Sequence, residues 1–254
     1  MENLVVNVLC VKNVSFKKID YIFNKLYISN MIVYIEGNIG SGKSTFVRLL
    51  LNELKKKGMN DYSYVQEPVD EWMNIKDNEG INILDKFYHD PKKWSFPFQM
   101  TTFITRVQKL SDIPKNKLAF VERSVYTDKN CFAKCLHESK HLNDIEWKLY
   151  CDWFDWLCNT FSVEPCAYIY LKSSPIVALK RIKKRSRNEE TTISLSYLSR
   201  LHEKHEMWMT NEMKKRRVLT IDVNQDFEHN EQRLEEIIEQ ITYFINNLSQ
   251  EARV

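Results

Sequence analysis

A short apolar run followed by a glycine-rich loop constrains the fold most strongly. Met31 to Glu36 (MIVYIE) is rich in β-branched and aromatic residues, and it is long enough for one buried strand but too short for a core helix. The next residues, GNIGSGKS from Gly37 to Ser44, match the pattern G-x-x-x-x-G-K-[ST]. Backbone N–H groups of such a loop surround nucleotide phosphates, and glycine lets the backbone approach them closely. The two segments together predict a nucleoside-triphosphate site.

The segment after the loop completes a strand–loop–helix unit. Phe46 to Leu54 (FVRLLLNEL) is amphipathic and predicts a helix whose positive N-terminal end faces the phosphates. We expect Lys43 to reach the β- and γ-phosphates and Ser44 to offer its hydroxyl to Mg²⁺. A chance glycine-rich loop would lack this flanking strand and helix. The nucleotide-binding residues predicted here are Gly37, Asn38, Ile39, Gly40, Ser41, Gly42, Lys43, Ser44 and Thr45.

Length and composition favour one folded domain. The 254 residues include only five Gly and six Pro, which leaves little room for linkers. The net charge of +3 does not indicate a polyanionic partner, and no apolar run approaches the length of a membrane span. Six cysteines without zinc-type spacing predict reduced, buried thiols in a cytoplasmic protein. We expect residues 31–254 to form the domain and residues 1–30 to be an N-terminal extension of unknown role.

Four more short apolar stretches predict further strands. Helical stretches separate the strands, which indicates βαβ units and a parallel sheet with ligands beyond its carboxyl ends. The predicted fold is therefore α/β, a P-loop NTPase-type three-layer sandwich with a five-stranded parallel sheet flanked by helices. The four stretches are residues 62–66, 117–121, 166–171 and 217–222.

Two of these strands lead into a glutamate, Glu67 and Glu122. Because parallel strands end at the same edge of a sheet, both carboxylates should converge on the phosphate loop. Either one alone could instead be a solvated strand end. His202 and His205, in the sequence HEKHE, miss the HExxH metalloprotease spacing, so we expect solvated helix histidines there.

Three long helices are predicted over residues 93–111, 124–141 and 143–161. The first and third carry many aromatic residues, which predicts mainly core packing and, for a helix apolar nearly all round, a dimer interface.

A further helix begins at Ser174-Pro175 and runs into a basic segment that includes Arg181, Arg185 and Arg187. This segment lacks the interleaved aromatic residues and wide basic surface of a nucleic-acid patch. We interpret residues 181–192 as a basic lid that closes arginines over a transferring phosphoryl group, with a solvated charge run as the alternative.

Six separated motifs together resemble those of the deoxyribonucleoside kinases, in that family's order, and most of all the deoxycytidine and deoxyguanosine kinase branch. The resemblance runs from about Met31 to the C-terminus. It implies transfer of the γ-phosphoryl group of ATP, with Mg²⁺, to the 5′-hydroxyl of a deoxyribonucleoside in nucleotide salvage, by a homodimer. The motifs are EGNIGSGKST, QEPVDEW, WSFPFQ with Arg106 downstream, FVERSVYTD, RIKKRSRNEE and IDVNQDF.

The resemblance also implies roles for the reacting groups. Glu67 matches the general base, Arg123 would hold the 5′-oxygen and phosphate region, and Glu122 matches the Mg²⁺ ligand, with Ser44 as the other protein ligand. The resemblance also allows Glu122 the role of proton acceptor, and the sequence leaves that choice open. The ATP-binding residues implied beyond the phosphate loop are the lid residues Arg181, Arg185 and Arg187 and the adenine loop Gln225, Asp226 and Phe227.

For the acceptor, Tyr88 and Glu190 match the pair that holds the sugar 3′-hydroxyl, and the tyrosine ring would crowd a 2′-hydroxyl. Deoxyribose should therefore be preferred. The implied deoxynucleoside-binding residues are Glu67, Trp72, Leu84, Tyr88, Phe98, Gln99, Arg106, Arg123, Asp128, Phe132 and Glu190.

Arg106 and Asp128 bear on the choice of base. Similar thymidine-preferring proteins carry an apolar residue at the first position, which leaves space for the thymine methyl group. A guanidinium paired with a carboxylate fills that space and suits cytosine or a purine. We predict a preference for deoxycytidine, deoxyadenosine or deoxyguanosine over thymidine. Thr102 and Phe87 depart from the branch pattern and leave the order among those three open.

Three alternatives remain at this point. One is a thymidine-preferring deoxynucleoside kinase. Another is a thymidylate-type nucleoside monophosphate kinase, whose acceptor phosphate calls for an extra arginine near Glu67, where the chain has Asp70 and Glu71. The third is a P-loop module that binds nucleic acid through residues 180–187, which salt-dependent DNA binding would support.

Overall fold

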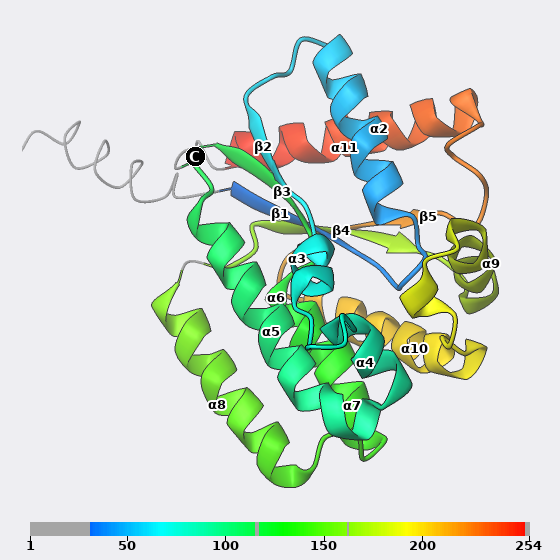
Figure 1. The fold of residues 1–254 in the computed structure, drawn as a ribbon. Helices are drawn as coiled ribbons and strands as arrows, with labels where there is room; N and C mark the ends of the chain where they lie inside the picture. Colours follow the sequence, from blue (N-terminus) through cyan, green and yellow to red (C-terminus); the bar gives the residue numbers. More distant parts are fainter. Residues whose placement is uncertain (1–30, 115–116, 162, 252–254) are drawn as a thin grey trace, which may run out of the picture.

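The computed structural model describes residues 31–114, 117–161 and 163–251, and the predicted N-terminal extension at residues 1–30 lies outside them. A five-stranded, all-parallel sheet forms the centre (Figure 1), in the order β2-β3-β1-β4-β5. The predicted α/β fold of the P-loop type is confirmed. The strands are β1 (Met31–Glu36), β2 (Tyr62–Val65), β3 (Leu118–Glu122), β4 (Ala167–Lys172) and β5 (Arg217–Asp222).

Helices cover both faces of the sheet, which explains why its strands are apolar on both sides. Successive side chains of β1 point to opposite faces, so Ile32 and Tyr34 lie in one core and Val33 and Ile35 in the other. Figure 1 shows α2 (Lys43–Lys56) and α11 (Glu231–Glu251) on one face of the sheet. The other face carries α5 (Pro91–Ser111) and α10 (Leu195–Glu212), and α8 (Asp144–Thr160) packs against α5. The three layers predicted from sequence are present.

Shorter helices surround the carboxyl edge of the sheet. A π-helical segment, Asp128–Ala133, joins α6 to α7 in one continuous helical rod. The rod ends at Glu138, whereas the sequence predicted a helix over residues 124–141. A 3₁₀ turn, Asn188–Glu190, follows α9. The sequence analysis placed no helix at α3, α4 or α11, and within α10 it indicated a helix only around His202 and His205. The shorter helices are α3 (Val69–Asn74), α4 (Ile83–His89), α6 (Val125–Thr127), α7 (Lys134–Glu138) and α9 (Pro175–Arg185).

The buried stripe of α5 mixes apolar and polar side chains. Its residues recur at spacings of three and four, as one helix face requires. Apolar members of the stripe fill the core, but Gln99, Thr102 and Arg106 are buried on it as well. Buried polar groups need partners, so this stripe points to a site. The buried residues of α5 are Ser95, Phe98, Gln99, Thr102, Phe103, Arg106, Val107 and Leu110.

His205 is buried, and the prediction of a solvated histidine at this position is wrong. It lies on the inner face of α10, three or four residues from Leu201, Trp208 and Met209, where the helix packs on the sheet. Its Nδ1 lies 2.7 Å from the carbonyl oxygen of Leu201. Burial lowers the pKa of His205 to about 3, so the ring is neutral at physiological pH.

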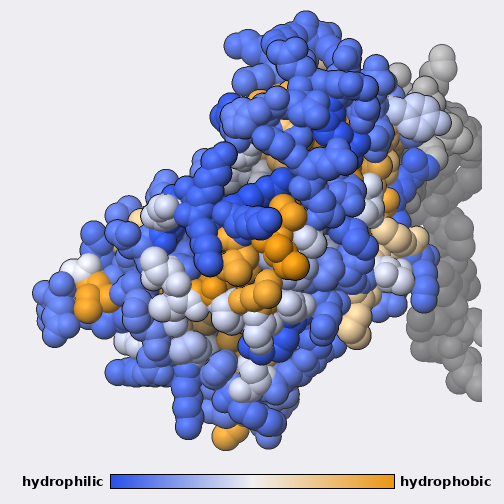
Figure 2. Space-filling model, turned by 90° about the vertical axis from the view of Figure 1, so that its right-hand side faces the viewer, coloured by the Kyte–Doolittle hydropathy of each residue, from blue (hydrophilic) through white to orange (hydrophobic). Residues whose placement is uncertain are grey.

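The outer surface seen in Figure 2, on the side of α9 and α10, is mostly hydrophilic with one compact apolar patch near its centre. None of the described helices is long and apolar enough to cross a membrane. The cysteines differ from the prediction of uniformly buried thiols. Cys131 and Cys135 are buried, but Cys151 and Cys158 are half-buried and Cys166 is exposed.

A glycine in the phosphate loop fixes the contact between that loop and α9. Gly40 has φ +76°, and a Cβ atom there would lie 2.4 Å from the carbonyl oxygen of Ala178. We predict that Gly40→Ala loses at least about 3 kcal/mol of unfolding free energy, because a strained backbone is combined with a clash against another backbone. Urea unfolding would measure it.

Gly58 supplies the matched control. It has the same φ of +76°, but a Cβ atom there would meet nothing within 4 Å. Gly58→Ala should therefore cost only the backbone strain, about 1–2 kcal/mol. Equal losses in the two variants would contradict the proposed tight contact.

Candidate active site

A cavity of about 340 Å³ opens beyond the carboxyl ends of β1 and β3. In a parallel sheet, ligands bind at this edge, where neighbouring strands send their connections in different directions. Its walls come from the phosphate loop, α3, α4, α5, the segment after β3 and the turn after α9. The predicted residues that line it are Ile39, Gly40, Gly42, Lys43, Ser44, Thr45, Glu67, Trp72, Leu84, Tyr88, Phe98, Gln99, Arg106, Glu122, Arg123, Asp128, Phe132, Arg185, Arg187 and Glu190.

The phosphate loop holds a buried cation. Lys43 is 6% exposed, and its Nζ donates to the carbonyl oxygens of Gly37 (3.1 Å) and Asn38 (3.0 Å). Burial, with the nearby Arg123 guanidinium, lowers the pKa of Lys43 to about 7. Two neutral carbonyls compensate an ammonium poorly, so an anion would improve the site. The loop therefore fits nucleotide phosphates.

Glu122 lies at the end of β3, beside the first turn of α2. Ser44 Oγ donates to Glu122 Oε1 (2.8 Å), and the Tyr64 hydroxyl donates to Glu122 Oε2 (3.0 Å). No cluster of three or more His, Cys, Asp or Glu able to hold a metal occurs in the described part of the chain. Mg²⁺ in phosphate sites commonly takes one or two carboxylates and completes its shell with water and phosphate oxygens. The Ser44–Glu122 pair fits that kind of ion.

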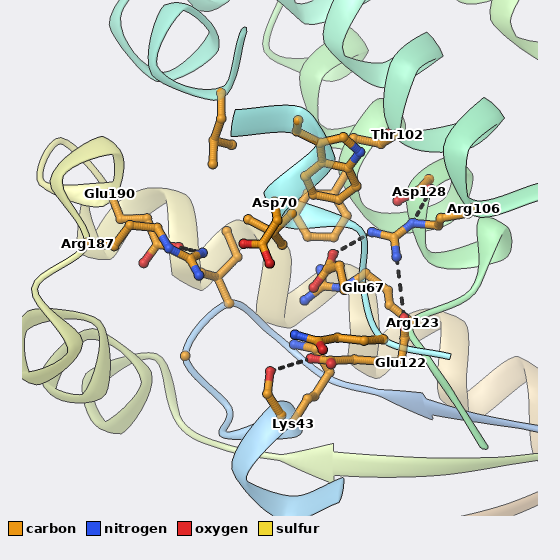
Figure 3. A pocket seen from close by; sticks show the side chains of 18 of the residues that line it. Lys43, Glu67, Asp70, Thr102, Arg106, Glu122, Arg123, Asp128, Arg187 and Glu190 are labelled. Atoms are coloured by element: carbon orange, nitrogen blue, oxygen red, sulfur yellow. Dashed lines mark hydrogen bonds and ion pairs between the residues drawn. The ribbon is translucent and has the colours of Figure 1, made fainter. Parts of the chain in front are cut away.

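Arg106 joins two carboxylates inside the cavity. Its Nε lies 2.8 Å from Asp128 Oδ2 and its Nη2 2.5 Å from Glu67 Oε1 (Figure 3). Arg123 adds a third interaction, with Nε 3.4 Å from Glu67 Oε1. The sequence suggested that Glu67 ends the second strand. In the structure β2 ends at Val65, and Glu67 lies two positions further along the chain. Three elements that are separate in sequence thus meet at one guanidinium.

These charges set the ionisation of both carboxylates. Burial alone would raise the pKa of Glu67, but the cations of Arg123, Arg106 and Lys43 hold it well below its ordinary value. Burial raises the pKa of Asp128 to about 6, although Arg106 opposes the rise. Glu67 is therefore fully ionised at neutral pH, and Asp128 titrates in the mildly acidic range.

Aromatic side chains form the walls of the deeper part of the cavity. The rings of Phe98 and Phe87 stack with centroids 4.6 Å apart, and Trp72 meets Phe98 edge-on at 5.6 Å. On the opposite side, Phe132 packs under the guanidinium of Arg123. Gln99 is buried, and its Oε1 has no hydrogen-bond partner among the described residues. A slot of rings with one free amide oxygen suits a planar, polar ring.

The basic segment after α9 closes one end of the cavity. Arg185 and Arg187 both pair with Glu190, the latter with Nη1 2.9 Å from Oε1 (Figure 3). Tyr88 and Glu190 both line the cavity, and burial, followed by the Glu190 carboxylate, raises the pKa of Tyr88.

Several predicted residues lie outside the cavity lining. Arg181 donates instead to the carbonyl oxygens of Ser41 (3.2 Å) and Val223 (2.7 Å). Phe227 is buried in the core against Phe46, with ring centroids 6.3 Å apart. The predicted residues that do not line the cavity are Gly37, Asn38, Ser41, Arg181, Gln225, Asp226 and Phe227.

Glu36 is a buried site residue that the sequence analysis missed. It accepts hydrogen bonds from the Ser124 N–H (2.9 Å) and from the Thr127 hydroxyl. It thereby fixes the start of the helical rod that carries Asp128. The signal was available, because Glu36 ends β1 just as Glu122 ends β3. Glu36 itself does not line the cavity; the lining residues without a predicted role are Gln66, Val69, Asp70, Phe87 and Thr102.

Comparison with known proteins agrees with this geometry. A family model described as deoxynucleoside kinase matches residues 33–246. The chain is 38% identical to the deoxycytidine kinase of Homo sapiens over 246 residues, covering 85% of this chain and 91% of that protein. It is 38% identical to a probable deoxycytidine kinase of Fowlpox virus, covering 85% and 88%. It is 36% identical to the mitochondrial deoxyguanosine kinase of Xenopus laevis, covering 84% and 89%.

We predict that Arg106→Met destabilises the protein by about 3–5 kcal/mol at pH 7, because it leaves two buried carboxylates without their partner. Urea unfolding measures the effect. The loss should shrink at pH 5, because the variant lacks the guanidinium that lowers the pKa of Asp128, and this buried carboxylate then becomes neutral by protonation more readily.

Lys109→Met on the same helix is the control, because the Lys109–Glu71 pair is 42% and 44% exposed. It should leave the free energy of unfolding nearly unchanged. A similar loss in both variants would contradict the central position given to Arg106.

Proposed function

Because the chain belongs to the deoxynucleoside kinase family, which uses a nucleotide as phosphoryl donor, we propose that ATP with Mg²⁺ is the donor and that the acceptor carries cytosine, adenine or guanine. The observation that carries the base proposal is the buried Arg106, 5% exposed and paired with Asp128 at the inner end of an aromatic slot. The relatives named as deoxycytidine and deoxyguanosine kinases support it.

Donor binding is assigned to the phosphate loop and the lid. Lys43 and the loop N–H groups would hold the phosphates, while Ser44 and Glu122 would hold Mg²⁺, which supplies charge neutralisation of the phosphates when bound. Arg185 and Arg187 would turn from Glu190 towards the transferring group. Arg181 would stabilise the loop through its bond to the Ser41 carbonyl. Gln225, Asp226 and Phe227 remain the proposed adenine contacts.

Glu67 is the proposed proton acceptor for the 5′-hydroxyl, with Arg123 holding the oxygen. Glu67 lies at the acceptor side of the cavity, whereas Glu122 is tied to Ser44 and Tyr64 beside the phosphate loop. This separation supports Glu67 as the proton acceptor and Glu122 as the Mg²⁺ ligand. The cations around Glu67 keep it ionised but weakly basic, so it would work mainly through position.

The sugar and base are assigned to the remaining walls. Tyr88 and Glu190 would bind the 3′-hydroxyl, and the rings of Trp72, Phe98 and Phe132 would enclose the base. Gln99 would use its free Oε1 on a base N–H, since that acceptor is otherwise unpaired. The charged Arg106–Asp128 pair offers donors and acceptors in place of a pocket for the thymine methyl group.

The alternatives receive less support. A monophosphate acceptor calls for a further arginine near Glu67, beyond Arg106 and Arg123, but the chain has Asp70 in the cavity lining and Glu71, which pairs with Lys109. A nucleic-acid module would use residues 180–187, but Arg181, Arg185 and Arg187 are engaged within the molecule. A thymidine preference remains the direct competitor for the base.

We also propose a homodimer formed through α5 and α8. An apolar face of this extent is typical of a protein interface. Five unpaired cysteines among the described residues support a reducing compartment, and we propose the cytoplasm. The exposed apolar residues are Ile104 on α5 and Ile145, Leu149, Trp153 and Trp156 on α8.

The first test is a steady-state panel of deoxycytidine, deoxyadenosine, deoxyguanosine, thymidine and dTMP with ATP and Mg²⁺. We expect turnover of at least one of the first three above thymidine, and a loss of about 10²–10⁴-fold in kcat for Glu67→Gln. Glu71 is the control, because it belongs to an exposed ion pair and does not line the cavity. The kcat of Glu71→Gln should stay within about twofold of that of the unchanged protein. A thymidine specificity constant above the other three would refute the base proposal, and turnover of dTMP alone would refute the acceptor.

The pH profile tests Asp128. Its pKa of about 6 means that the carboxylate becomes neutral as pH falls through 6. We expect kcat/KM for the preferred deoxynucleoside to fall in that range, since kcat/KM reports groups of the free enzyme. Asp128→Asn should lower kcat/KM and remove that limb of the profile. If the acidic limb of the kcat/KM profile were unchanged in Asp128→Asn, a group other than Asp128 would be responsible for it.

A further inference from the structure

A partly buried hydrogen bond joins the basic lid to the wall formed by α4. Asn82 Nδ2 donates to Glu189 Oε1 over 2.8 Å, across 107 positions of sequence. Glu189 is only 8% exposed and lies in the 3₁₀ turn Asn188–Glu190. A buried carboxylate depends on its donors, so this bond fixes the distance between the turn and α4.

Asn82 has a second bond that fixes α4 itself. It is the N-cap of this helix, and its Oδ1 accepts from the Asp85 N–H over 2.8 Å. The helix supplies Leu84, Phe87 and Tyr88 to the cavity. One amide therefore orients α4 with its oxygen and the lid turn with its nitrogen.

On the other side of the bond, Glu189 is followed directly by Glu190. Glu190 binds both lid arginines, Arg185 and Arg187, and lines the cavity with them. Figure 3 shows Glu190 beside Arg187. Any movement of the lid that carries Glu189 outward must break the bond to Asn82. The connection from the α4 wall to the lid arginines is thus continuous through directly bonded or adjacent residues.

We propose that Asn82 and Glu189 form a latch that couples the two substrates. Both are positioning residues, because they act through α4 and the lid. A deoxynucleoside packed against α4 holds the latch in place, and the latch holds the lid turn at a position from which the neighbouring arginines can turn to the donor phosphates. Each substrate should then strengthen binding of the other by the same factor. The inference rests on the proposed assignment of α4 to the deoxynucleoside and of the lid to the donor.

Asn82→Asp separates the two bonds of the amide. Aspartate is as good an N-cap as asparagine, so α4 keeps its cap, but a carboxylate now faces Glu189 in place of a donor. The measurement is the dissociation constant of the preferred deoxynucleoside, by titration calorimetry, with and without a saturating non-hydrolysable ATP analogue and Mg²⁺. We expect the tightening caused by the analogue to fall about fivefold or more, which corresponds to loss of one hydrogen bond.

Reversing the polarity of the bond provides the rescue. In the double variant Asn82→Asp with Glu189→Gln, the amide donor is at position 189 and the acceptor at position 82, so the tightening should return to within about twofold of the unchanged protein. Glu189→Gln alone keeps an acceptor for Asn82 and should have little effect. Glu189→Ala removes the latch without touching the cap, and should reproduce the loss even if Asn82→Asp folds poorly.

Asn143→Asp is the matched control, because Asn143 caps α8 in the same way and lies outside the cavity lining. It should leave the tightening unchanged. Absence of tightening in the unchanged protein, no loss in Asn82→Asp and Glu189→Ala, or failure of the double variant to restore it would overturn the latch. If the unchanged protein neither binds nor phosphorylates any deoxynucleoside, the proposed function fails instead, and the two failures are distinguishable.

Discussion

A buried guanidinium shared by two carboxylates is the interaction on which the rest of the structure depends. Arg106 comes from α5, Asp128 from the π-helical segment and Glu67 from the connection after β2. A buried charge without a partner would cost several kcal/mol, a large part of the net free energy of folding. The three elements are therefore stable only when they approach to within hydrogen-bond distance of one another. The three residues line the cavity together, and the arginine keeps the pKa of Glu67 low, so that this carboxylate is ionised. The aromatic side chains and the phosphate loop line the same cavity.

The sequence predicted the sheet well and the helices unevenly. Strands such as Met31–Glu36 are short and apolar because both faces of a parallel sheet are covered, and that signal is local. At HEKHE in α10 the sequence indicated a helix but not which face of it is buried, because charged residues surround the neutral, buried His205. The short helices α3 and α4 have too few turns for a period to emerge, and the end of the rod after β3 depends on a turn at Ser139 rather than on composition.

Within the candidate site, residues of the recognised motifs could be predicted from sequence, Arg106 and Asp128 included, but the contacts of those motifs with residues outside them could not. The phosphate loop, Glu122-Arg123 and the lid are read from local patterns. The bond between Asn82 and Glu189 joins positions 107 apart, and nothing in either neighbourhood identifies the other. Phe227 was assigned to the adenine from its motif, yet it packs in the core beneath the loop, because an aromatic residue in a motif can serve folding as well as binding.

The buried Lys43 has a consequence for how the protein meets its donor in solution. Without phosphates nearby, its pKa is about 7, and an adjacent polyanion would raise that pKa towards the ordinary range. Below pH 7 the ammonium is already charged, so no proton needs to move. Above pH 7 the Lys43 amine is largely neutral without the donor, so binding of the donor is accompanied by uptake of a proton by Lys43. On the proposed assignment of Lys43 to the donor phosphates, affinity for the donor is linked to proton uptake and declines as the solution becomes more alkaline.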